Sequence, residues 1–136
     1  MEKSKLLSLI EDKKDELFCL LSELIKINSE NFGTYGNEEK CARYIYQYCE
    51  SLGLDNDIFS PMDIDGFENH PDYLPGRNLE NRYNVTARWV GENNEDSLMI
   101  MGHTDTVEFG DLKNWEFPPL SGAIFCYFAQ YTSPHS

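Results

Sequence analysis

The sequence predicts a fold of the α/β or α+β class, in which two helices near the amino terminus pack on a sheet. Apolar residues recur at helical spacing in two early segments, at residues 4–27 and 37–52. Two segments with strand character follow at residues 83–90 and 97–103, separated by a short polar loop. The simplest geometry for these strands is an antiparallel hairpin within a sheet of mixed direction.

The first predicted helix carries a stripe of leucine and isoleucine side chains. Its members are Leu6, Ile10, Leu17, Leu21 and Leu24. A polar stretch from Glu11 to Glu16 interrupts the stripe, so the helix is expected to be either continuous or broken near its middle. It should end at residues 27–29, before a loop at residues 31–36 that is rich in turn-forming residues.

The second predicted helix has recognisable start and stop signals. Asn37 is the expected N-cap, and Glu38 and Glu39 lie in the first turn, where the helix dipole favours carboxylates. Gly53 is expected to end the helix. The apolar stripe consists of Cys41, Ile45, Tyr48 and Leu52.

The remainder of the chain is expected to be a long connection followed by the two strands. Residues 55–81 contain several prolines and glycines without periodicity, which predicts an irregular connection. Residues 83–90 alternate apolar and polar side chains, as in a half-buried strand. Residues 98–101 are all large and apolar, which is typical of a strand buried on both faces.

A histidine and an aspartate follow this apolar segment directly. In an extended chain, residues two apart point to the same side, so His103 and Asp105 can share one small volume at the end of the strand. Open α/β sheets place ligands at that edge. A neutral imidazole can bind a divalent metal through one nitrogen while a carboxylate accepts from the other, which fixes the ring. The bare pattern is also common, and a structural histidine with satisfied hydrogen bonds explains it equally well.

A longer set of short motifs surrounds this pair. They are Met101–Val107, Asn114–Trp115, Pro118–Pro119 and Leu120–Gly122, preceded by His70–Leu79 and Asn84–Val85. With them the chain, up to about Ile124, resembles the zinc-dependent aminoacylase and deacylase family of metallopeptidases, which includes acetylornithine deacetylase and succinyl-diaminopimelate desuccinylase. The resemblance implies that His103 is a metal ligand and that Asp105, counted with the catalytic residues, orients it.

The resemblance also carries expectations about fold, cofactor and substrate. It implies the amino-terminal part of an α/β/α sandwich with a mixed sheet, the zinc exopeptidase fold, here incomplete. The cofactor would be zinc or cobalt, with two ions per site in full-length members of the family. The reaction would be hydrolysis of amide bonds in N-acyl amino acids or small peptides.

The domain prediction divides the chain at residue 124. Residues 1–124 are expected to be the amino-terminal part of the catalytic domain, and residues 125–136 an atypical tail without Asp, Glu or Gly. Members of the family continue here with a glycine-rich segment and further metal ligands. We therefore expect an amino-terminal piece of such an enzyme, cut short or read out of frame near Phe125 and inactive alone.

Composition restricts the partners and the compartment. Lys and Arg total 11 against 24 Asp and Glu, a net charge of −13, which argues against nucleic acid or an anionic membrane as partner. No apolar run approaches the length of a membrane span, and residues 1–5 do not resemble a signal peptide, so a cytoplasmic location is expected. The four cysteines show no Cys-x-x-Cys pair and are interpreted as small core residues: Cys19, Cys41, Cys49 and Cys126.

A second class of function remains open alongside the hydrolase. A small acidic domain, or a remnant of an enzyme, can bind a partner through unpaired strand edges without catalysing a reaction. Self-association or a homo-oligomer is the corresponding expectation for this chain, because residues 98–101 need cover on both faces.

Overall fold

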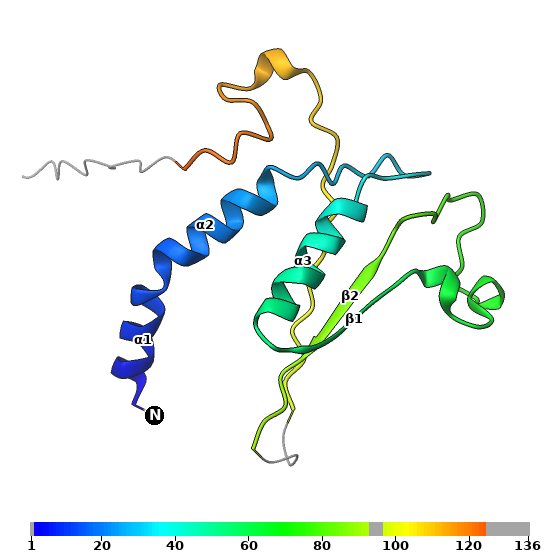
Figure 1. Cartoon of the computed structure of the whole chain (residues 1–136). Helices are drawn as coiled ribbons and strands as arrows, with labels where there is room; N and C mark the ends of the chain where they lie inside the picture. The colour runs from blue at the N-terminus through cyan, green and yellow to red at the C-terminus, as the bar shows by residue number, and fades with distance from the viewer. Residues whose placement is uncertain (1, 93–96, 125–136) are drawn as a thin grey trace, which may run out of the picture.

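The computed structural model describes residues 2–92 and 97–124 of the chain (Figure 1). Its regular elements, in order, are α1 (Lys3–Asp12), α2 (Lys14–Ile25), α3 (Glu39–Ser51), β1 (Asp55–Phe59) and β2 (Asn84–Arg88). Three single turns of 3₁₀ helix lie at Pro61–Asp63, Phe67–Asn69 and Leu112–Asn114. Helices and a sheet are therefore both present, which agrees with a small α/β fold. The predicted tail at residues 125–136 lies outside the described residues.

The first predicted helix is broken in its middle, at Lys13. This residue leaves the helical conformation, with φ −96° and ψ 2°, and its amide donates to Ile10 O in a tighter turn. Two exposed ion pairs lie at the break, one between Lys13 and Glu16 and one between Lys14 and Glu11. Every described residue of α1 is exposed, and Leu17 of α2 is 60% exposed, so the predicted apolar stripe is not buried along most of its length.

Only one of the two predicted helices packs on the sheet. Helix α3 lies across both strands, whereas α1 and α2 stand apart from them (Figure 1). A cavity of ≈ 1160 Å³ opens between α2 and α3. Its apolar lining includes Leu21, Leu24, Ile25, Cys41, Ala42 and Ile45. Cys41 and Ala42 are the buried apolar residues among those described, so the core is small.

The two ends of α3 differ in how well the sequence signals describe them. The N-cap is Glu38 and not Asn37, whose side-chain Nδ2 donates instead to Asn28 Oδ1. The carboxyl end follows the prediction, because Gly53 adopts a left-handed φ of 72°. In that conformation Gly53 N donates to Glu50 O, and the following amide donates to Cys49 O, which closes the helix.

The predicted hairpin is wrong, because β2 pairs with a different strand. β1 and β2 are antiparallel, with Asp55 opposite Arg88 and Phe59 opposite Asn84. β1 lies inside the segment that was predicted to be an irregular connection. Its sequence, Asp-Asn-Asp-Ile-Phe, begins with three residues of poor strand propensity, so pairing with β2 and packing under α3 decide its conformation.

The prediction of a buried strand at residues 97–103 is also wrong for this structure. The segment is not part of a strand, and the side chains of residues 98–101 are 83–88% exposed. A strand that is apolar on both faces needs a layer on each side. The described residues provide a single helix layer, α3, on a two-stranded sheet.

Of the four cysteines predicted to lie in the core, the structure describes three, and these differ in burial. Cys41 is buried, and burial raises the pKa of its thiol. Cys49 is half-buried and Cys19 is exposed, so the prediction is wrong for Cys19. The apolar stretch around Cys19 lies on a helix, α2, that has little to pack against. Cys126 lies outside the described residues.

A buried ion pair joins the start of α3 to the segment before β2. The Arg82 Nη2 to Glu38 Oε1 distance is 2.6 Å, and the two side chains are 15% and 7% exposed. A side chain at position 36 would collide with the Glu38 carboxylate, so the glycine there permits this close approach. The pair thus fixes the start of α3 relative to the sheet.

We expect Arg82→Ala to lower the free energy of unfolding by about 3–5 kcal/mol, because the substitution leaves a buried carboxylate without its partner. Arg88→Ala is the matched control, since it breaks an exposed pair with Asp55 whose side chains are 73% and 68% exposed. That control should cost no more than about 1 kcal/mol. Urea denaturation of both variants measures the difference, and equal losses would contradict a structural role for the buried pair.

Candidate functional site

The segment that carries His103 and Asp105 is held against the chain between α2 and α3. Residues 29–31 and Thr106 form a short parallel bridge, in which Thr106 N donates to Ser29 O at 3.0 Å and Asn31 N donates to Thr106 O at 2.9 Å. In Figure 1 the loop after α2 crosses the later segment above α3. The candidate site is therefore built from two segments far apart in the sequence.

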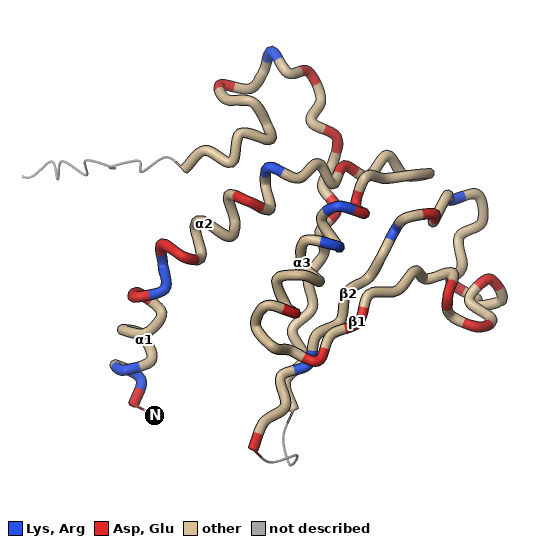
Figure 2. Tube along the Cα trace, in the orientation of Figure 1, with Lys and Arg blue, Asp and Glu red and all other residues tan. Residues whose placement is uncertain are grey.

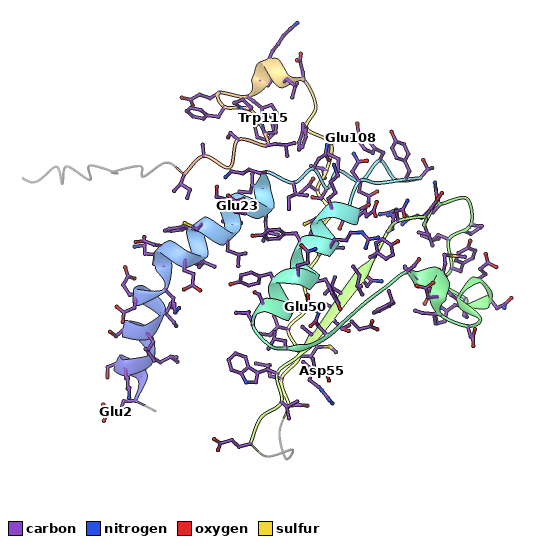
Figure 3. The ribbon with its side chains drawn as sticks, viewed as in Figure 1. Glu2, Glu23, Glu50, Asp55, Glu108 and Trp115 are labelled. Carbon is purple, nitrogen blue, oxygen red and sulfur yellow. The ribbon has the colours of Figure 1, made fainter. Side chains whose placement is uncertain are left out.

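Two side chains of the first segment strengthen this contact. Glu30 is 9% exposed, and its Oε1 accepts from Phe109 N at 2.9 Å. Its other oxygen accepts from the Asn28 amide at 3.0 Å, so both carboxylate oxygens are bonded. Trp115 then closes the far end of the loop, because its Nε1 donates to Phe109 O at 2.8 Å (Figure 3).

Asp105 lies between His103 and Asn31. Its Oδ1 is 3.1 Å from His103 Nδ1, and its Oδ2 accepts from Asn31 Nδ2 at 2.9 Å. The structure thus brings together the two residues that the sequence predicted, and it adds Asn31, which the sequence reasoning missed. The available signal was a run of polar residues, Asn28 to Asn31, directly after an apolar helix.

The hydrogen bonds of His103 determine which ring nitrogen carries the proton. Nδ1 lies 3.0 Å from the carbonyl oxygen of Asp105 and 3.1 Å from its carboxylate, and both are acceptors. The neutral ring must therefore be protonated on Nδ1. Nε2 then keeps its lone pair, has no hydrogen-bond partner among the described residues, and belongs to a side chain that is 84% exposed.

The same contacts affect the ionisation of Asp105. The hydrogen bond from Asn31 holds the pKa of the Asp105 carboxyl below its ordinary value of 3.8. Partial burial acts in the opposite direction, and the hydrogen bond and charge of His103 lower the pKa further. The carboxylate is therefore ionised at neutral pH and available as an acceptor for the imidazole N–H.

A second histidine in the chain has the same spacing to an aspartate but a different geometry. His70 Nδ1 accepts from the backbone N–H of Asp72 at 3.2 Å, and the Asp72 carboxylate is 3.8 Å away. The lone pair of Nδ1 is thus used, and the carboxylate does not orient the ring. Of these two pairs, the one at His103 has the arrangement that suits a metal ligand.

The described residues fit one ligand of a metal site. His103 Nε2 is free, and a carboxylate on the opposite nitrogen fixes the ring, as is usual for histidine ligands of zinc. Within residues 2–92 and 97–124, however, no group of three His, Cys, Asp or Glu side chains is arranged to hold a metal ion. The fit is therefore to a single ligand with its orienting carboxylate.

Comparison with known proteins relates the chain to hydrolases. No family model matches it. Over 112 residues it is 30% identical to a succinyl-diaminopimelate desuccinylase of Blochmanniella floridana, and the aligned residues cover 81% of this chain and 23% of that protein. Over 120 residues it is 32% identical to an uncharacterized metallohydrolase of Methanococcus maripaludis, covering 81% of this chain and 25% of that protein. The chain is similar to one part of several hydrolases.

A further relative is an N-formyl-4-amino-5-aminomethyl-2-methylpyrimidine deformylase of Halalkalibacterium halodurans. It is 26% identical over 120 residues, which cover 88% of this chain and 24% of the deformylase. The chain thus spans about a quarter of the length of the curated relatives it matches. No helix in the described part of the chain is long and apolar enough to cross a membrane.

We expect Asp105→Asn to flatten the acid end of the stability profile. Because the folded pKa of Asp105 is lowered, its contribution to stability is complete above the unfolded value of 3.8 and is lost as the pH falls through the folded pKa. The asparagine variant lacks this titration, so its stability should change less with pH in that range. Urea denaturation from neutral pH to below pH 3.8 measures this. Asp65→Asn, at an exposed position, should keep the wild-type profile.

Proposed function

We propose that this chain supplies one metal ligand, His103, to a hydrolase that cleaves amide bonds in N-acyl amino acids or small peptides. The observation that carries the proposal is the hydrogen bonding of the His103 ring, which fixes Nδ1 against Asp105 and leaves the lone pair of Nε2 free. The similarity to a desuccinylase, a deformylase and a metallohydrolase supports the reaction class.

In this proposal the metal is zinc or cobalt, and two ions occupy the complete centre. When bound, such a metal polarises the carbonyl of the substrate and lowers the pKa of a bound water. His103 would hold the metal through Nε2. Asp105 would keep the ring in its Nδ1–H tautomer and raise its basicity as a ligand. The described residues would provide the first part of an α/β/α sandwich in a cytoplasmic enzyme.

The test of this proposal is a calorimetric titration of the chain with zinc. Asp105→Asn should weaken zinc binding about 10-fold, because it disturbs the orientation of the ligand without removing it. His103→Ala should weaken zinc binding further, because it deletes the ligand itself.

The matched control for that titration is His70→Ala, which removes a histidine at the same spacing from an aspartate but with a different hydrogen-bond arrangement. This variant should retain the affinity of the wild type. Zinc binding that survives His103→Ala, or that His70→Ala abolishes, would show that the metal binds elsewhere.

A second candidate function is binding of another polypeptide chain, and one observation favours it. The side chains of Leu98, Met99, Ile100 and Met101 are 83–88% exposed in succession, on a segment that pairs with no strand among the described residues. Apolar extended segments with free backbone groups add readily to a strand of another chain. In this function the partner is a second copy or another protein with a free strand edge.

We expect Ile100→Lys to reduce self-association of the chain, because a lysine on an exposed extended segment opposes edge-to-edge pairing. Sedimentation velocity over a range of concentrations measures the effect. Leu7→Lys is the control, since Leu7 is 56% exposed on α1 and far from this segment in the sequence. A wild-type chain that is monomeric at all concentrations would contradict association through residues 98–101.

A further inference from the structure

Asn31 is the residue through which the chain after α2 acts on the candidate site. Its Nδ2 donates to Asp105 Oδ2 at 2.9 Å, and its Oδ1 accepts from Gly33 N at 2.8 Å. Both ends of the amide are thus used, and the backbone N–H is used as well, in the bridge to Thr106. Turning the amide over would place its oxygen against a carboxylate and its NH₂ against an N–H, so a single orientation is stable.

The histidine depends on this arrangement because little else holds it. The His103 side chain is 84% exposed, and both acceptors that face its Nδ1 belong to Asp105. The Asp105 carboxylate is 38% exposed and is anchored from outside the pair by Asn31. The orientation of the imidazole is therefore determined through Asp105 by a side chain 74 residues earlier in the sequence.

We infer that Asn31 is a positioning residue, which holds the Asp105 carboxylate so that His103 keeps its proton on Nδ1 and presents Nε2. An imidazole without such a partner carries its proton mainly on Nε2, and in that tautomer Nε2 has no lone pair to offer a metal. The inference rests on the proposed function only in its consequence for metal affinity. The tautomer of His103 is a property of the chain without metal.

The decisive variant is Asn31→Asp. An aspartate keeps the size of the side chain and still offers an oxygen to Gly33 N, so the loop retains its turn. It replaces the donor facing Asp105 by a second carboxylate, which repels the first. We expect the ¹⁵N chemical shifts of the His103 ring, measured in weakly alkaline solution without metal, to move toward the Nε2–H tautomer. Zinc affinity should fall about 10-fold.

Asn78→Asp is the matched control. The exposed Asn78 side chain also accepts from a backbone N–H two residues later, that of Glu80, but it lies outside the contact between residues 28–31 and 105–109. The control adds the same charge in a similar turn without disturbing Asp105 or Glu30. It should leave the His103 tautomer unchanged. The backbone amide NMR signals of the α3 residues report whether each variant keeps the fold.

A swap of the two side chains provides the rescue. In the single variant Asp105→Asn, the new NH₂ group faces either the NH₂ group of Asn31 or the imidazole N–H, and both of these are donors. This variant should therefore also shift the tautomer. In the double variant Asn31→Asp with Asp105→Asn, residue 105 can donate to residue 31 and still accept from Nδ1–H. We expect the double variant to recover the wild-type tautomer ratio and part of the zinc affinity.

The outcomes separate the inference from the proposed function. The inference is overturned if Asn31→Asp leaves the tautomer ratio as in the wild type, if Asn78→Asp changes it equally, or if the swap gives only the sum of the two single effects. If the tautomer follows the predicted order while His103→Ala leaves zinc binding intact, the positioning role stands and the metal-binding role of His103 is wrong.

Discussion

The contact between residues 28–31 and residues 105–109 is the interaction on which the rest of the site depends. It combines two backbone hydrogen bonds with two side-chain bonds, from Asn31 to Asp105 and from Phe109 to Glu30. Each bond is worth only about 1 kcal/mol. Together they place a largely exposed segment, which lacks a packed strand beneath it, in one position relative to the amino-terminal helices.

Among the described residues, the two buried acidic side chains, Glu30 and Glu38, are stabilised in different ways. Glu30 is surrounded by neutral donors, an amide side chain and a backbone N–H, whereas Glu38 is paired with the guanidinium of Arg82. The other acidic residues are spread over the three helices, β1 and the connecting segments, as Figure 2 shows, and most are exposed. With a net charge of −13, each buried carboxylate needs a specific partner, and these partners join segments that are distant in the sequence.

The two histidines show why residue spacing alone does not define a site. His70 and His103 each precede an aspartate by two residues, but Nδ1 accepts a hydrogen bond in the first and donates one in the second. The difference arises because Asp105 is held from outside by Asn31, whereas Asp72 is 92% exposed and its carboxylate is free to turn away. Of these two neutral rings, only that of His103 keeps a nitrogen lone pair outside these hydrogen bonds.

The sequence by itself determined the helices, the glycine that ends α3, and the pairing of His103 with Asp105, because these depend on neighbours within a few residues. It left open whether the first helix is continuous, and the structure shows the break at Lys13. Tertiary structure decided that β2 pairs with β1, that residues 97–103 stay outside the sheet, and that Asn31 joins the site. Strand pairing and long-range hydrogen bonds depend on which segments meet in space. Local propensity does not specify which segments meet. In β1, whose first three residues are polar, local propensity even disfavours the strand that the structure contains.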